Sequence, residues 1–440
     1  MLRIALLDFV QRTKINSYRR FFAATLTWDR PKILAYQNER LAGLIRHAYH
    51  NVPYYWKIMR EGNISPDRVK STSDLQMFPV LERETLRLEA ANLRATNVPP
   101  SRMRSGSTSG TTGTPVIFAH DIEGYSAGLA AGDFLRGLSG WNPGRRHMRI
   151  GGDTATRGRW DRRNSKDEDF LMRQVHVSAP YPDDPEKIRI LADRIAAIDP
   201  VSIEGPPSVI HALARHVQGR GLVLKGLVRV LTTGEILGAR EKQDMEIALA
   251  PVADLYGCAE VFGIASRPVR EDRYYVCDPH VIVETADSKI PGIKDLLVTD
   301  LDARGLPLIR YRVGDLIDDL RAPEKDARLP FTYFRRVVGR NSEIIRLPNG
   351  LSLHPIQAFG GTLFRQYPAI TRHRVVWDGK SLAFIFEIAG LFPREELEQQ
   401  LAEWIRPYGA AYTVEYTPKI EPSADGKHAF FEIVNRGSRR

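Results

Sequence analysis

The stretch Arg104-Ser105-Gly106-Ser107-Thr108-Ser109-Gly110-Thr111-Thr112-Gly113-Thr114-Pro115 combines glycines with hydroxyl side chains and runs directly into the apolar segment Val116-Ile117-Phe118. Glycines let a backbone bend so that several N–H groups point at one anion, and Ser and Thr hydroxyls add further donors. The stretch therefore predicts a loop that binds a polyphosphate. A flexible Ser/Gly linker is the alternative, but a linker would not be rich in threonine or lead straight into a strand. The pattern differs from GxxxxGK[ST], because no lysine follows its last glycine.

Length and composition indicate a globular protein of more than one domain. A chain of 440 residues is too long for one ordinary core, and we expect two or three domains. The hydrophobic fraction of 43% and the charged fraction of 26% are typical of soluble proteins. The two cysteines, Cys258 and Cys277, form no CxxC pair and have no His/Cys cluster beside them, which disfavours zinc and disulfides. A reducing, cytoplasmic setting fits best.

The charge pattern suits small polyanions. The formal net charge is +10, which favours nucleotides, coenzyme A, acidic sugars or anionic lipid. The charge is scattered and no aromatic-plus-basic motif stands out, so nucleic acid is not expected as the main partner. No apolar run approaches the ~20 residues that span a bilayer, and no signal peptide is evident. Residues 1–30 are amphipathic, which leaves two alternatives: a helix on a membrane surface or, as we favour, one packed on its own domain.

Alternating strands and helices predict an α/β fold with a parallel sheet. Short apolar strands lie between amphipathic helices from residue 185 onward, a pattern typical of a sheet buried on both faces. The expected strands are 201–205, 227–232 and 253–256, and the expected helices are 185–197, 207–217 and 238–249. Ligands of such sheets bind just past the carboxyl ends of strands, where Thr232–Glu235 and Tyr256–Glu260 lie.

The remaining sequence predicts a large N-terminal domain, residues 1–338, and a small C-terminal one, residues 339–440. Within the first, residues 272–335 read as a β-rich subdomain, because alternating apolar runs are separated by Gly, Asp and Pro. In the second, two strands flank the turn pair Asp378-Gly379, and a helix follows at 393–406. We expect this α+β domain to be separately folded and mobile.

The order of these motifs resembles the acyl-adenylate-forming superfamily. The loop at 104–115, the run Leu308-Ile309-Arg310-Tyr311-Arg312-Val313-Gly314-Asp315, the pair Gly339-Arg340 and a late Gly426-Lys427 all fit its pattern. The nearest match resembles the phenylacetate–CoA ligase family, in its branch associated with capsular polysaccharide clusters. The resemblance covers nearly the whole chain. It implies an ATP-dependent ligase that makes an acyl-AMP and pyrophosphate from a carboxylic acid, and then transfers the acyl group.

The resemblance also implies which residues bind the nucleotide. The loop would hold the β- and γ-phosphates of ATP, through Ser107, Thr108, Ser109, Gly110, Thr111, Thr112 and Gly113. Tyr256, followed by Gly257, would stack on adenine, with the backbone of Gly234 and Glu235 on the other side. Asp315 would accept hydrogen bonds from the ribose hydroxyls, and Arg340 would reach the ribose or a phosphate. Without this context, Tyr256 would be a packing aromatic, Asp315 a turn residue and Arg340 a surface residue.

Two residues would take part in the chemistry itself. Glu260 would ligate Mg2+, a hard cation that takes carboxylate and phosphate oxygens. Lys427 would offset the repulsion between the attacking carboxylate and the phosphate, because a cation that reaches both anions stabilises the charge that builds up. A lysine on a loop of a mobile domain can close for the first step and withdraw for the second. Taken alone, a loop lysine is usually exposed and inert.

Several alternatives stay open at this stage. Ala259 stands where many members of the family carry Ser or Thr, and Ser342 stands where an acidic residue is usual, so a nucleotide-binding protein without catalysis is one alternative. The acceptor is expected to be the thiol of coenzyme A, with a sugar hydroxyl or an amine as the alternative. A homodimer is also left open. The acid pocket is expected beside a helix at 121–138, lined by small or apolar residues: Gly128, Ala131 and Phe134.

Overall fold

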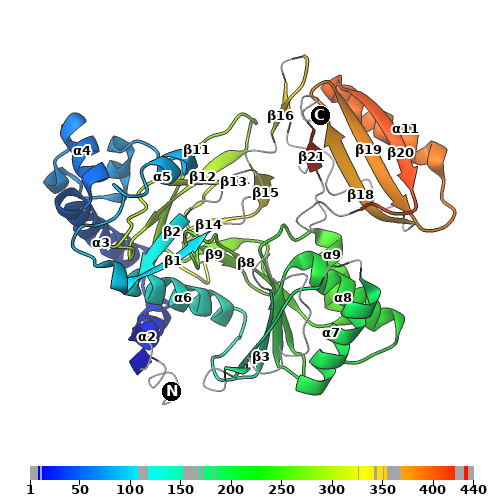
Figure 1. Ribbon diagram of the computed structural model, residues 1–440, viewed down its shortest axis with the longest axis horizontal. Helices are drawn as coiled ribbons and strands as arrows, with labels where there is room; N and C mark the ends of the chain where they lie inside the picture. The colour runs from blue at the N-terminus through cyan, green and yellow to red at the C-terminus, as the bar shows by residue number, and fades with distance from the viewer. Residues whose placement is uncertain are drawn as a thin grey trace.

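The computed structural model describes residues 8–9, 12–107, 117–151, 168–169, 173–180, 182, 184–325, 327–340, 344–349, 351–353, 367, 369–421 and 431–434. Figure 1 shows the blue N-terminal helices on one side, the green helices below, and the C-terminal strands and helix above them. Within the described residues, no helix has both the length and the apolar character needed to cross a bilayer.

The chain begins with helices whose starts are set by local capping. The carboxylate of Asp29 accepts a hydrogen bond from the Lys32 backbone N–H at 2.9 Å, and Pro31 suits the first turn of the helix that follows. The amphipathic segment at 15–25 packs on α6 and buries Phe22 completely, which favours the packed alternative over a membrane helix. The N-terminal elements are α2 (Ile15–Thr25), α3 (Arg30–Asn51), α4 (Pro53–Glu61), η1 (Pro66–Arg68), η2 (Thr72–Met77), α5 (Arg83–Leu88) and η3 (Pro100–Arg102).

A nine-stranded sheet forms the centre of the molecule. Its strand order is β14-β10-β9-β8-β7-β6-β3-β5-β4, and the run from β5 through β3, β6 and β7 to β8 is parallel. Its strands are β3 (His147–Ile150), β4 (Glu168–Asp169), β5 (Gln174–Val177), β6 (Ser202–Gly205), β7 (Arg229–Thr233), β8 (Val252–Tyr256), β9 (Ala265–Arg267), β10 (Tyr274–Val276) and β14 (Tyr333–Phe334). The sequence placed β10 and β14 in a β-rich subdomain, whereas pairing joins them to this sheet.

Helices cover both faces of this sheet. One face packs against α7 (Pro185–Ile198), α8 (Pro207–Gly219) and α9 (Ala239–Ala248), which share a core with the parallel strands. The other side receives α6 (Ile122–Gly137), which contacts β8 and β9. Burial on both faces explains why these strands read as continuous apolar runs in the sequence.

Smaller sheets lie beside the central one. A four-stranded antiparallel sheet contains β11 (Val281–Asp287), β12 (Lys294–Asp300), β13 (Tyr311–Ile317) and β15 (Val337–Arg340). The hairpin of β1 (Met103–Ser107) and β2 (Ile117–Asp121) lies next to α6. These elements place β13 and the hairpin near the end of β8, where the site is expected.

The C-terminal strands form a module with its own core. Its sheet has the order β20-β19-β18-β21 and packs against α11. The elements are β16 (Ile345–Arg346), β17 (Ser352–Leu353), β18 (Ile370–Trp377), β19 (Ser381–Ile388), α11 (Arg394–Ile405), η7 (Arg406–Tyr408), β20 (Ala411–Thr417) and β21 (Phe431–Ile433). The predicted α/β class is confirmed, whereas the domain boundary at 338 and 339 stays a prediction.

Candidate active site

Part of the predicted site lies outside the described residues. This is so for Thr108, Ser109, Gly110, Thr111, Thr112 and Gly113, and also for Lys427 and Ser342. Ser107 ends strand β1, so its backbone is placed beside the start of that loop. The remaining predicted residues are Gly234, Glu235, Tyr256, Gly257, Glu260, Asp315 and Arg340, and all of them are described.

The loop after β8 is tightly folded. The Cys258 N–H donates to the Val261 carbonyl at 3.0 Å, so the chain turns back immediately after the strand. A Cβ on Gly257 would come within 3.3 Å of the Gly263 backbone nitrogen, so only a residue without a side chain fits there easily. This turn places Glu260 at the carboxyl end of the parallel sheet, where ligands of α/β proteins bind. Burial raises the pKa of the Cys258 thiol, which disfavours its action as a nucleophile.

Three of the predicted nucleotide-binding residues meet in the structure. The Tyr256 hydroxyl donates to Asp315 Oδ2 at 2.8 Å, and Arg340 Nε lies 3.6 Å from Asp315 Oδ1. Arg340 is aligned with Asp315 because β13 and β15 pair in that register. Burial raises the pKa of Tyr256, and the Asp315 carboxylate raises it further, so the hydroxyl stays a proton donor. The grouping offers a ring face, a carboxylate and a cation at one strand end.

Glu260 is a buried carboxylate with two partners. Its Oε1 accepts from Arg83 Nη1 at 2.9 Å and from the Tyr311 hydroxyl at 3.0 Å. Only 5% of the residue is exposed. Burial raises the pKa of Tyr311, and Glu260 raises it further, so this hydroxyl also remains a donor. Mg2+ is commonly bound by one or two carboxylates together with the phosphate oxygens of the substrate. Glu260 offers such a carboxylate, so the residues present fit that ion.

Sequence reasoning did not find the partners of Glu260. Arg83 lies in α5, 177 residues earlier in the chain, and nothing local marks it as part of a site. Tyr311 stands in the motif at 308–315 but received no role there. Tyr311 lies on β13, the strand that also carries Asp315, but the register of β13 shifts between the two residues, so simple alternation along the strand does not relate their side chains.

The predicted contribution of Gly234 and Glu235 comes from the loop after β7. Gly234 has φ +83°, which a glycine adopts without strain. The Glu235 carboxylate accepts a hydrogen bond from the Ser208 N–H at 3.0 Å and thereby caps the start of α8. The side chain therefore stabilises a helix, and the proposed role near adenine rests on the backbone alone.

The predicted acid pocket beside α6 is wrong for two of its three residues. Ala131 and Phe134 are buried in a core cluster with Phe22 and Phe331. Gly128 is covered by Phe262, whose Cβ would lie 3.1 Å from an added Cβ. The small residues serve the close approach of the helix to the loop after β8.

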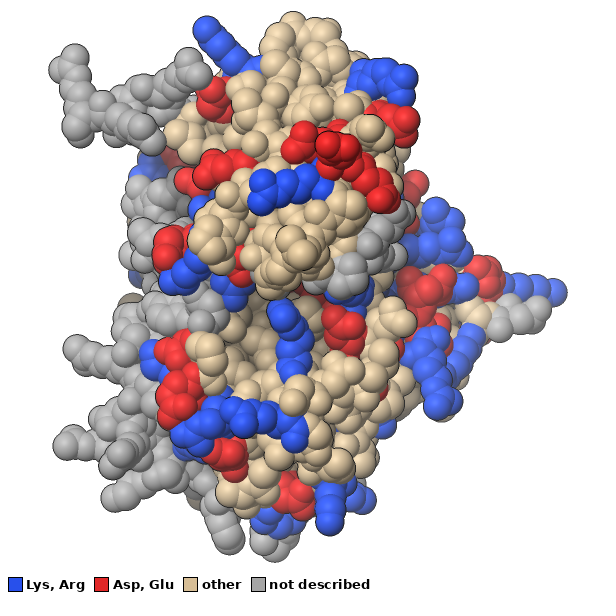
Figure 2. Space-filling view, turned by 90° about the vertical axis from the view of Figure 1, so that its right-hand side faces the viewer, with Lys and Arg blue, Asp and Glu red and all other residues tan. Residues whose placement is uncertain are grey.

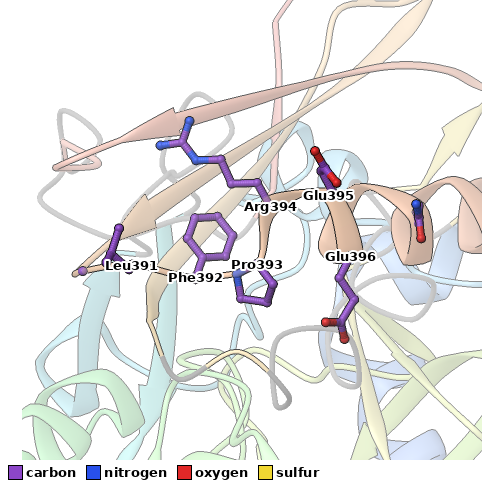
Figure 3. Close-up of a pocket in the computed structure, with 8 residues that line it drawn as sticks. Leu391, Phe392, Pro393, Arg394, Glu395 and Glu396 are labelled. Atoms are coloured by element: carbon purple, nitrogen blue, oxygen red, sulfur yellow. The ribbon is translucent and has the colours of Figure 1, made fainter.

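A separate surface hollow lies at the start of α11 (Figure 3). Residues 390–396 and Gln399 line it, and the Arg394 guanidinium lies over the Tyr416 ring at 4.7 Å. None of the described residues that were predicted for the nucleotide site lines this hollow, so the hollow is not evidence for that site. On the face shown in Figure 2, basic and acidic side chains are interspersed, as the scattered charge of the sequence predicted.

Comparisons with known proteins identify relatives over most of the sequence. Protein CapK of Staphylococcus aureus is 22% identical over 320 residues, which cover 70% of this chain and 68% of CapK. The phenylacetate-coenzyme A ligase of Aromatoleum evansii is 27% identical over 349 residues, which cover 74% of each chain. No protein-family model matches the chain. The resemblance that was predicted from the motifs is confirmed by these relatives.

Several solved structures share this fold. A 2-hydroxyisobutyryl-CoA ligase in its postadenylation state has a TM-score of 0.71 at 19% identity, covering 91% of this chain and 88% of the other. The same enzyme in the thioesterification state has a TM-score of 0.58 at 18% identity, covering 92% of each. The amide bond synthetase McbA from Marinactinospora thermotolerans has a TM-score of 0.51 at 18% identity, covering 74% and 68%. The chain therefore has the fold of acyl-CoA ligases of the adenylate-forming superfamily.

Proposed function

We propose that this protein is an AMP-forming acid–CoA ligase. In the first step, an oxygen of a carboxylic acid attacks the α-phosphorus of ATP, and pyrophosphate leaves. In the second step, the thiol of coenzyme A attacks the acyl carbon of the acyl-AMP, and AMP leaves with the bridging oxygen. The proposal is supported by the sequence similarity to CoA ligases and by the fold.

The observation that carries the proposal is the meeting of Tyr256, Asp315 and Arg340 beside the loop of Glu260. In this arrangement, the Tyr256 ring packs against adenine while its hydroxyl orients Asp315. Asp315 then accepts hydrogen bonds from the ribose, and Arg340 supplies a positive charge at the same edge. These contacts fix the nucleoside, so that the α-phosphate has a defined position for attack.

Two further residues complete the proposal. Glu260 would hold Mg2+, and that ion would supply the positive charge that offsets the phosphate charge when pyrophosphate leaves. Arg83 pairs with this carboxylate through Oε1, the oxygen that also accepts from the Tyr311 hydroxyl. Lys427 approaches the carboxylate and the α-phosphate, as the sequence predicts, and reduces the repulsion between them.

The alternative acceptor is an amine or a sugar hydroxyl. The similarity to CapK and the fold shared with an amide bond synthetase favour keeping it. Adenylation would be the same, but acyl transfer would not depend on coenzyme A. An assay with and without coenzyme A separates the two acceptors. The rate of AMP release should rise on addition of coenzyme A only if its thiol is the acceptor.

The test of the proposal is pyrophosphate release from ATP and Mg2+ across a panel of aryl, fatty and sugar carboxylic acids. We expect acid-dependent release in the wild type, a loss of about 100-fold in Lys427→Ala and a loss in Asp315→Ala. Nucleotide binding should persist in Lys427→Ala and weaken in Asp315→Ala. If ATP binds but no acid gives release above Lys427→Ala, the ligase proposal fails and a nucleotide-binding partner protein takes its place.

A further inference from the structure

Two buried histidines hold the loop that carries Glu260. His120 Nε2 lies 3.2 Å from the Ala259 carbonyl oxygen, and His280 Nε2 lies 3.1 Å from the Phe262 carbonyl oxygen. Because a carbonyl oxygen only accepts hydrogen bonds, both Nε2 atoms carry the proton. The loop is therefore tied on each side of Glu260, by residues from two different parts of the chain.

His120 connects this loop to the hairpin of the predicted phosphate loop. It lies in β2, opposite Arg104 of β1, and is 6% exposed. Its ring packs on the Phe262 ring with centroids 4.6 Å apart. A shift of the hairpin would thus be transmitted to Ala259 and to the neighbouring carboxylate.

His280 anchors the same loop to the N-terminal helices. Its Nδ1 lies 2.8 Å from Asp302 Oδ2, and Arg40 Nη2 of α3 donates to Asp302 Oδ1 at 2.5 Å. Asp300 Oδ1 lies 4.0 Å from Nδ1 and accepts the backbone N–H groups of Asp302 and Ala303. Both ring nitrogens of His280 thus lie within hydrogen-bond distance of oxygen atoms, Nδ1 of a carboxyl oxygen and Nε2 of a carbonyl oxygen. Burial alone would lower the pKa of His280, but Asp300 and Asp302 outweigh it, and the pKa is raised.

A metal ion is the other reading of His280, Asp300 and Asp302, whose ligand atoms lie within 4.8 Å of one another. The charges argue against it. Arg40 donates to one carboxylate, the backbone N–H groups of Asp302 and Ala303 donate to the other, and the raised pKa of His280 favours its cationic form. A metal would need the Nδ1 lone pair and would leave Arg40 beside an excess of positive charge.

We propose that His120 and His280 are positioning residues, which fix the Ala259 and Phe262 carbonyls and thereby aim Glu260 at the nucleotide phosphates. The proposal rests on the function proposed above, in which Glu260 holds Mg2+. Outer hydrogen bonds of this kind typically change metal affinity or activity by about tenfold or more. Loss of either contact should therefore weaken the dependence of binding on Mg2+ and leave nucleotide binding without the ion unchanged.

The test compares His120→Phe with His120→Gln. Phenylalanine keeps a ring against Phe262 but cannot donate, whereas glutamine keeps a donor. We expect the apparent Mg2+ affinity to fall about tenfold in the first and less than threefold in the second. His211→Phe is the control. His211 of α8 lies 2.8 Å from Asp244 of α9, and neither helix carries the loop of Glu260.

Binding is measured by calorimetry with an ATP analogue that has a methylene group between the α- and β-phosphates, once with Mg2+ and once with a chelator. Asp302→Asn tests the same role through His280, because it changes the partner of His280 Nδ1. It serves as the second variant in case His120→Phe does not fold. In ring-labelled protein, the same variant should lose the proton on His280 Nδ1 in nitrogen NMR spectra near neutral pH.

The outcomes separate this proposal from the ligase proposal. If the folded variants keep the wild-type Mg2+ dependence, or the wild type shows none, the positioning role is overturned. If the wild type binds the analogue with Mg2+ but releases no pyrophosphate with any acid, the ligase proposal fails while the positioning role stands.

Discussion

Tyr256 shows how one residue can serve both packing and binding. Its ring lies edge-on to Phe334 with centroids 5.8 Å apart, and its hydroxyl donates to Asp315. Phe334 packs against the Tyr256 ring, and the Tyr256 hydroxyl donates a hydrogen bond to the Asp315 carboxylate. The two parts of the side chain can therefore be separated by substitution.

The first prediction concerns this separation. Tyr256→Phe keeps the ring but no longer orients Asp315, so affinity for ATP should fall by only about threefold, while loss of the hydrogen bond to a charged group should lower the free energy of unfolding by about 1.5–3 kcal/mol. Tyr256→Ala also removes the stacking surface and should lose more than tenfold in affinity, roughly the worth of base–aromatic stacking. Equilibrium dialysis and urea unfolding measure the two effects. Equal losses of affinity in both variants would contradict stacking by the ring.

At the scale of elements, the loop after β8 depends on close contact with α6. Gly263 has φ +64°, and a Cβ there would come within 2.7 Å of the Gly132 nitrogen and 2.8 Å of the Ala131 Cβ. The loop has no room for a side chain at this position. The same contact explains why small residues recur along α6, which the sequence interpreted as a pocket.

The second prediction uses two glycines with similar backbone conformations. Gly263→Ala and Gly292→Ala both place an alanine at positive φ, but nothing lies within 4 Å of the new Cβ at Gly292. We expect about 1 kcal/mol of destabilisation from backbone strain in both, and a further 1–3 kcal/mol from crowding in Gly263→Ala only. Urea unfolding measures the difference, and nucleotide binding should weaken only in Gly263→Ala. Equal effects would show that the loop can move away from α6.

The elements were more accessible to sequence reasoning than the contacts between them. The strands at β6, β7 and β8 and the helices between them follow from local periodicity, and the structure confirms them within a few residues. Arg83, by contrast, reaches Glu260 across 177 residues, and no local pattern encodes such a contact. The error about Ala131 and Phe134 has the same origin, because small size alone does not distinguish a pocket wall from a packed helix face.

At the scale of the molecule, the C-terminal module forms a core of its own. Its buried residues come from β16, β18, β19, β21 and α11, with Phe384 and Phe386 at the centre. The module consists mainly of the sheet of β20, β19, β18 and β21 and the helix α11 that packs on it. A module with a separate core can reorient between the two proposed steps.

The third prediction follows from that separate core. We expect two transitions in calorimetry, of which the one belonging to the C-terminal module is sensitive to acid. Burial lowers the pKa of His373 in β18 from 6.5 to about 3. Between the unfolded pKa of 6.5 and the folded pKa of about 3, the unfolded chain takes up a proton that the folded module does not, so stability falls as the pH drops through this range. In His373→Gln this part of the pH dependence should disappear; an unchanged acid shift would contradict the assignment.

Adenylation itself is tested most directly by following an oxygen atom. A carboxylic acid that gives turnover is supplied with isotopically labelled carboxylate oxygens, together with ATP, Mg2+ and coenzyme A, and the products are analysed by mass spectrometry. Attack on the α-phosphorus leaves the bridging oxygen on AMP, so we predict labelled AMP and unlabelled pyrophosphate. Label in inorganic phosphate with formation of ADP, or unlabelled AMP, would contradict adenylation by this site.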